Sequence, residues 1–117
     1  PGGSRPAKDA KPFYRKRRMT LPKTIRMAGV PLNTVRRDLS EDGTYGHYSH
    51  SRKLIVVDKS LAPGVLRDTI RHEMMHAAFA FSGLSYCEHW EEEAVVRCME
   101  EVFFPSWERF LKRFKMN

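Results

Sequence analysis

Residues 65–83 read VLRDTIRHEMMHAAFAFSG, and this stretch predicts the central helix of the fold. Its apolar side chains recur at helical spacing and fall near one helix face. They are Val65, Leu66, Ile70, Met74, Ala77, Ala78 and Phe81. Gly83 follows the last of them, and glycine is the residue most suited to end a helix. We therefore expect an amphipathic helix from Val65 to about Gly83 that packs against a core.

Strands are expected before this helix. The segment LIVVD at residues 54–58 has a β-branched centre with charged neighbours, which is typical of a strand. Residues 23–28 alternate polar and apolar side chains, and residues 32–37 follow after a turn at 29–31. Glycines at 43 and 46 are expected to mark turns. Residues 45–50 (YGHYSH) are interpreted as a polar turn with aromatic residues.

A second helix is expected from about Trp90. Its apolar stripe comprises Val95, Val96, Met99, Val102 and Phe103. Pro105 is expected to interrupt or kink it, since proline removes a helical hydrogen bond. Ser106 could then cap a last helical run. The order predicts an α+β fold, with a small, mostly antiparallel sheet followed by two long helices against one face.

The composition is that of a single globular domain. The chain has 117 residues, 41% hydrophobic and 30% charged. No run of eighteen apolar residues is present, so we expect no membrane-spanning segment and no membrane partner. The first residues contain no apolar secretory segment. Cys87 and Cys98 are too few for a disulfide framework and are expected to be small buried apolar residues. These features favour a cytoplasmic location, which would be the host cytoplasm for a phage-encoded protein.

The positive charge is concentrated at the start of the chain. Residues 1–18 hold seven Lys/Arg and one acid, whereas the whole chain has 21 and 14. We interpret residues 1–18 as a disordered basic arm or a cloning remnant, and residues 19–117 as the domain. Residues 5–18 would suit weak contact with nucleic acid or another polyanion. A solvated tail explains them too, and the oligomeric state is left open.

The motif with chemical content is H-E-x-x-H at residues 72–76. Spacing of four residues places His72 and His76 on one helix face, where two neutral imidazoles can share one Zn²⁺. Glu73 would lie beside the metal and could take a proton from a metal-bound water. Two histidines and a glutamate on a core-facing helix are costly to bury without a common partner. The motif therefore predicts a zinc site with Glu73 as general base.

The third zinc ligand must come from another part of the chain, because a catalytic zinc has three protein ligands. Glu92 is the first choice, since it lies one turn before Val95 and Val96 on the axis of the expected stripe. Glu93 is the second choice, and His89 is an alternative imidazole ligand. Donors for a developing oxyanion are sought among Tyr45, His47, Tyr48, His50, Tyr86 and His89.

Residues 44–104 resemble the small zincin-like metallopeptidases of phages and bacteria. The resemblance rests on a Gly-rich turn, the strand at 54–58, the segment DTIRHEMMHA at 68–77, Gly83-Leu84, and EEAVV at 92–96. The acidic pair is similar to the gluzincin arrangement and to ImmA/IrrE-like peptidases, whose third ligand is a glutamate. The SprT-like group is the second choice. Its third ligand is a histidine, a role that His89 would take, although Trp90 stands where that group usually has glycine.

The resemblance implies a zincin-like fold and a zinc-dependent metallopeptidase. His72, His76 and Glu92 would hold Zn²⁺, and Glu73 would be the catalytic base of peptide-bond hydrolysis. The substrate would be a peptide or protein, bound in extended form along a sheet edge. The alternative is a non-catalytic metal-binding module on the same scaffold, associated with nucleic acid through the N-terminal arm.

Overall fold

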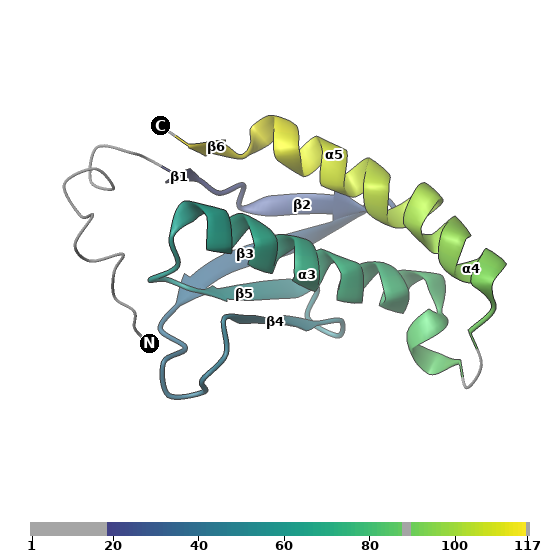
Figure 1. The fold of residues 1–117 in the computed structure, drawn as a ribbon, viewed down its shortest axis with the longest axis horizontal. Helices are drawn as coiled ribbons and strands as arrows, with labels where there is room; N and C mark the ends of the chain where they lie inside the picture. Colours follow the sequence, from purple (N-terminus) through teal and green to yellow (C-terminus); the bar gives the residue numbers. More distant parts are fainter. Residues whose placement is uncertain (1–18, 88–89, 117) are drawn as a thin grey trace.

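The computed structural model describes residues 19–87 and 90–116, and it leaves out the side chains of residues 19, 20, 115 and 116. A four-stranded sheet comes first and the long helices follow (Figure 1). The strands are β1 (Met19–Thr20), β2 (Thr24–Met27), β3 (Val30–Arg37), β4 (Gly46–Ser49), β5 (Leu54–Asp58) and β6 (Lys115–Met116). The helices are α3 (Pro63–Ser82), η1 (Leu84–Tyr86), α4 (Glu92–Arg97), η2 (Cys98–Phe103) and α5 (Phe104–Arg113). The predicted α+β class is confirmed.

The main sheet has the strand order β2-β3-β5-β4 and is mixed. The pairs β2–β3 and β4–β5 are antiparallel, as expected, but β3 and β5 are parallel. After β3 the chain passes through residues 38–45, forms β4 and then returns as β5 next to β3. This path leaves β4 at the edge of the sheet, paired only with β5 among the described strands. A short second sheet pairs β1 with β6.

The core lies between one face of the sheet and α3. Ile25, Leu32, Ile55 and Val57 project from the strands into the same cluster as residues of α3. The contributing α3 side chains are Leu66, Ile70, Met74, Ala77 and Ala78, each fully buried. Burial of apolar side chains gives roughly 1.5–3 kcal/mol for each large residue, so this interface dominates the stability of the domain. It also leaves the face of α3 that carries His72 and His76 exposed to solvent.

The strand boundaries correct two sequence interpretations. The turn between β2 and β3 lies at Ala28 and Gly29, both with positive φ, so β3 begins already at Val30. Gly46 does not mark a turn but opens β4. A Cβ at Gly46 would lie 2.8 Å from the Val56 carbonyl oxygen and 2.9 Å from Thr69 Cγ2. Glycine is therefore required here because both β5, through Val56, and α3, through Thr69, approach this residue closely.

Pro105 does not interrupt the helical run, because α4, η2 and α5 follow one another without a gap. The π-helical η2 directly precedes it, and Pro105 occupies the first turn of α5. A π-helical turn changes the local hydrogen-bonding pattern, so a proline can follow without breaking the helix. Ser106 is not a cap either. It is buried, and its hydroxyl donates to the Arg26 carbonyl, which ties α5 to β2.

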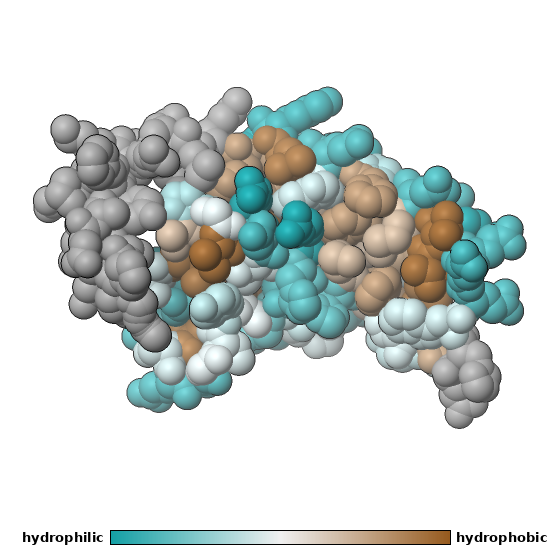
Figure 2. Space-filling view, viewed as in Figure 1, coloured by the Kyte–Doolittle hydropathy of each residue, from teal (hydrophilic) through white to brown (hydrophobic). Residues whose placement is uncertain are grey.

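The helical side of the molecule is not uniformly polar. Figure 2 shows a hydrophilic band crossing this side between areas of hydrophobic surface. Large apolar side chains remain exposed on the helices and just before α4, namely Val65, Trp90, Val96, Phe104 and Leu111. None of the helices in the described ranges has the length and apolarity required to cross a bilayer.

Candidate metal centre

Helix α3 carries the motif, and its ends follow from local chemistry. Pro63 stands in the first turn, where its missing N–H is not needed. Gly83 ends the helix with φ 85°, in the left-handed region, and its N–H bonds to the Ala80 carbonyl. The predicted helix end at Gly83 is confirmed, and the start lies two residues before the predicted Val65.

His72 and His76 meet on the exposed side of α3, as their spacing predicts. Their Nε2 atoms lie 3.2 Å apart, and the rings meet edge to face. Two nitrogens bound tetrahedrally to one zinc ion at about 2.0–2.1 Å are separated by about 3.3 Å. The observed separation therefore fits two ligands of a single zinc ion without rearrangement of the helix.

The Glu73 side chain, unlike those of His72 and His76, is directed into the protein. Its side chain is only 5% exposed, whereas both neighbouring histidines are exposed. Burial raises the pKa of the Glu73 carboxyl, and His72, His76 and His47 act in the opposite direction. A carboxylate with a raised pKa beside two imidazoles is suited to accept and return a proton.

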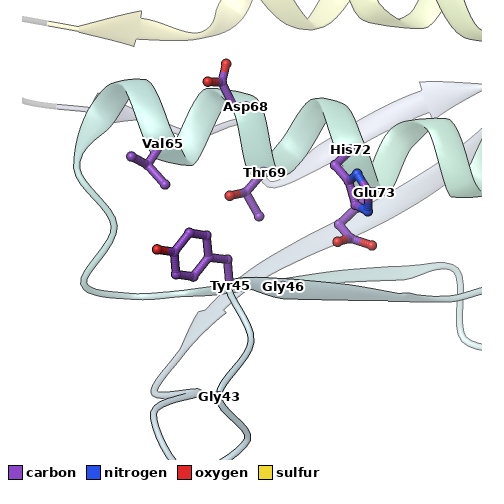
Figure 3. A pocket seen from close by; sticks show the side chains of 8 residues that line it. All are labelled: Gly43, Tyr45, Gly46, Val65, Asp68, Thr69, His72 and Glu73. Carbon is purple, nitrogen blue, oxygen red and sulfur yellow. The ribbon is translucent and has the colours of Figure 1, made fainter. Parts of the chain in front are cut away.

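Two hollows adjoin at this point, and both include Gly46, His72 and Glu73. The first has a volume of about 730 Å³ and extends toward Tyr45, Val65 and Thr69. Figure 3 shows the Glu73 carboxylate directed from α3 toward β4, with Tyr45 below Val65 and Thr69, and Asp68 directed away. The site is thus a trough between α3 and the edge strand.

The second hollow, of about 470 Å³, gathers four of the chain's five histidines. Those four are His47, His50, His72 and His76, and Tyr48 and Tyr86 line the same hollow. In the sequence, residues 45–50 were interpreted as a polar turn. The tyrosines of YGHYSH were the available signal for a strand, since aromatic residues favour strands, but two glycines within four residues obscured it.

Tyr48 and His50 form a hydrogen-bonded pair within this hollow. The Tyr48 hydroxyl lies 2.7 Å from His50 Nδ1, and the His50 ring packs edge to face on Phe81. Burial, aided by Tyr86, raises the pKa of Tyr48 to about 12, so the phenol keeps its proton at neutral pH. Burial and then Lys53 lower the pKa of His50, so its ring is neutral. Tyr48 therefore donates to Nδ1, which leaves Nε2 to carry the imidazole proton.

The third ligand was predicted at the start of α4. Trp90, just before this helix, packs against α3: the centre of its ring lies 4.9 Å from that of Phe79, which is one turn beyond His76. Glu92 and Glu93 are exposed in the first turn of α4. His89 lies outside the described residues. Among residues 19–87 and 90–116, no three His, Cys, Asp or Glu side chains are grouped closely enough to hold a metal ion.

The facing of α4 differs from the sequence expectation. Ala94 and Val95 pack against the core, whereas Val96 is 45% exposed. The apolar stripe is therefore shifted by one residue, because the helix packs on Ala94 rather than on Val96. The residue one turn before Ala94 and Val95, on the same side of the helix, is Glu91. In the structure Glu91 therefore takes the position relative to the apolar stripe that the sequence assigned to Glu92.

The two cysteines have different environments. Cys98 is buried, as predicted, and its thiol contacts Ser82 and the Ala78 carbonyl. Cys87 is exposed, so the prediction that it is a buried apolar residue is wrong. It follows η1 in a short connection after α3, where the chain leaves the core.

The chain was compared with family models, with curated proteins and with solved structures, and none of the three comparisons returned a match. The features that point to a metal centre are therefore the geometry of His72, Glu73 and His76 and the trough around them.

Proposed function

We propose that this protein is a zinc-dependent metallopeptidase in which Glu73 is the general base. The observation that carries the proposal is the 3.2 Å separation of the His72 and His76 Nε2 atoms beside a buried glutamate. A purely structural metal site needs ligands only, whereas a buried carboxylate with a raised pKa next to those ligands suits proton transfer.

His72 and His76 would hold the metal with a third ligand from the start of the second helical run. Glu92 is the first candidate, with Glu93 and His89 as alternatives. Zinc, when bound, supplies Lewis-acid polarisation and lowers the pKa of water. The Glu73 carboxylate would accept the proton of the attacking water and return it to the leaving amine.

Other groups in the trough suit a peptide substrate. Strand β4 is an edge strand whose second side is unpaired among the described strands, so an extended peptide could align along it. His50 lines the same hollow as His72 and His76, and its Nε2–H, with the ring held by the Tyr48 hydroxyl, would serve as a neutral donor to the developing oxyanion. These features support hydrolysis of an extended peptide or of an unfolded protein segment.

The first experiment is elemental analysis of the purified full chain after zinc is supplied and excess removed. The variants are His76→Ala, Glu73→Gln, Glu91→Ala, Glu92→Ala, Glu93→Ala and His89→Ala, with Glu108→Ala as an exposed control on α5. Glu91 is included because α4 packs on Ala94 and Val95, one turn after Glu91. We expect about one zinc per chain, retained in Glu73→Gln and Glu108→Ala and lost in His76→Ala and in one variant at 89–93.

A peptide-library digest then tests catalysis. We expect hydrolysis by the zinc-loaded chain and a loss of about 10²–10⁴-fold in Glu73→Gln. Absence of zinc from the wild-type chain would contradict the metal site. Zinc binding without hydrolysis of any peptide would contradict the peptidase and leave the non-catalytic metal-binding module.

A further inference from the structure

The main sheet has a second face, opposite the helices, with a small cluster of its own. Leu39, Leu54 and Val56 are buried there, with Val35 packed against them. These residues do not belong to the larger cluster formed with α3. This face is therefore separate from the trough that contains His72 and Glu73.

A hollow of about 540 Å³ lies on this face. It is lined by Lys23, Asn33, Thr34, Val35, Arg37, Arg52 and Leu54. Backbone pairing brings the three cations together from different parts of the chain. The Thr34 N–H donates to the Lys23 carbonyl at 2.9 Å, and the Asn33 N–H donates to the Lys53 carbonyl, next to Arg52, at 2.9 Å. Strand β3 itself supplies Arg37.

The charged residues that line the hollow are all cations, three among the described residues. The two ion pairs found within the described ranges join Asp68 to Arg67 and to Arg71 on α3, so neither involves a cation of this hollow. Two acids lie next to it: Asp58 is the cross-strand partner of Arg37 and accepts a hydrogen bond from the Leu39 N–H, and Asp38 accepts one from the Ser40 N–H. Val35 and Leu54 add apolar lining beside the three cations, which are exposed and therefore accessible to a polyanion.

We infer that this hollow binds the sugar–phosphate backbone of a nucleic acid. The inference does not depend on the proposed peptidase activity, since no residue is shared with the trough. Arginine guanidinium and lysine ammonium groups are the usual partners of phosphate oxygens, and the Asn33 side chain adds an amide donor.

The backbone pairing of the sheet argues against an acidic peptide as the occupant. Strand β3 is paired on both sides, with β2 and β5, and β5 is paired with β3 and β4. Their main-chain groups are thus already used, and an added peptide strand would find no backbone partners here. The donors that remain are charged side chains. These can bind the phosphate groups of a nucleic acid, whose negative charge lies along its backbone.

The dimensions and chemistry of the hollow indicate contact with several phosphates and not with bases. Asn33 and Arg37 are four residues apart on β3, about 13 Å at the usual rise of a strand. DNA carries one phosphate per about 3.4 Å of axis on each strand, so this length of β3 corresponds to several phosphates. No aromatic residue lines the hollow, so base stacking does not contribute. Binding is therefore independent of base sequence.

The test is fluorescence anisotropy of the full chain with a labelled duplex of about 20 base pairs, between about 50 and 200 mM salt. The first variant combines Lys23→Gln, Arg37→Gln and Arg52→Gln. The matched control combines Arg97→Gln, Arg109→Gln and Lys112→Gln, which removes the same charge from exposed positions on the helices. Both retain residues 1–18, so any contribution of that segment is common to the two.

We expect the hollow variant to bind at least tenfold more weakly at about 100 mM salt. Its slope of log K against log salt should fall by about 2–3, since each lost phosphate contact removes about 0.9. The control variant should keep the wild-type slope. Arg37→Lys with Arg52→Lys, which keeps the charge, should retain most of the slope. An unchanged circular dichroism spectrum of the hollow variant shows that its loss of binding is not one of folding.

Three outcomes would overturn the inference. Equal losses in both triple variants would mean that only the net charge matters. An unchanged affinity of the hollow variant would place nucleic-acid binding elsewhere in the chain. Displacement of the duplex by a polyglutamate peptide of equal charge, lost in the same variant, would identify an acidic protein segment as the occupant.

Discussion

Gly46 on the edge strand and Thr69 on α3 are so close that a Cβ at Gly46 would lie 2.9 Å from Thr69 Cγ2. This contact sets the width of the trough at Glu73, because Thr69 lies one turn before Glu73 on the same helix. The position of β4 relative to the proposed catalytic base therefore depends on the absence of one side chain.

Gly46→Ala should push β4 away from α3 and destabilise the fold by about 1–3 kcal/mol, the usual cost of overpacking. Gly64→Ala is the matched control, because a Cβ there meets no atom within 4 Å and Gly64 lies in the first turn of α3. It should be neutral or stabilising by about 0.4–1 kcal/mol. Urea unfolding followed by circular dichroism measures both. Equal stability of the two variants would contradict the close approach.

Glu73→Gln should stabilise the zinc-free protein while it removes the proposed activity. The buried carboxylate loses hydration when ionised, whereas an amide of the same shape has no charge to bury. We expect a gain on the order of 1 kcal/mol at neutral pH, as is common when a functional charge is removed from a site. Calorimetry of both proteins after treatment with a chelator gives the value. A lower melting temperature in Glu73→Gln would show that the carboxylate has a structural role.

Tyr48 should ionise only at strongly alkaline pH. Its pKa is raised to about 12, mainly by burial, so the folded state retains a proton that the unfolded chain loses near pH 10. The sign follows from linkage: stability is lost as the pH rises from about 10 to 12. Titration followed by absorbance near 295 nm should contain a late step that disappears in Tyr48→Phe. Tyr45→Phe should keep that step, since Tyr45 is 63% exposed.

Zinc should stabilise the folded chain through His72 and His76. A ligand at about 100 times its Kd adds about 2.7 kcal/mol when it binds only the native state. Thermal unfolding with and without zinc should show this gain, and a chelator should reverse it. Without zinc, His72→Ala and His76→Ala should alter stability by less than about 0.5 kcal/mol, because both side chains are exposed. Each variant should lose the response to zinc.

The matched control for this measurement is His47→Ala, which removes an exposed imidazole from the same hollow. It should keep the response to zinc. If His47→Ala abolishes the response and His76→Ala does not, the pair on α3 does not bind the metal.

Several elements could be predicted from the sequence because their signals are local. The β-branched LIVVD run is β5, and the apolar spacing from Val65 to Phe81 lies within α3. Gly83 ends α3 as predicted, since a left-handed residue is needed at that point. The meeting of His72 and His76 likewise follows from a spacing of four residues on one helix.

Other features depend on contacts between distant residues and could not be predicted locally. Gly46 looked like a turn residue, but the approach of Thr69 from another element requires glycine within a strand. Ser106 looked like a cap, but Arg26, eighty residues earlier, supplies its partner. Pro105 was expected to break the helix, but the π-helical turn before it changes the backbone hydrogen-bonding pattern, so the helical run continues.

Spacing along short stretches of chain therefore encodes the α+β order of elements, the helix that bears the motif, and the pairing of its two imidazoles. Long-range packing is needed for the rest. It makes β3 and β5 parallel, leaves β4 at the edge beside Glu73, packs α4 on Ala94 and Val95, and brings three cations from separate segments to the opposite face. These outcomes arise from the packing of apolar side chains between elements far apart in the sequence, and local propensity does not encode it.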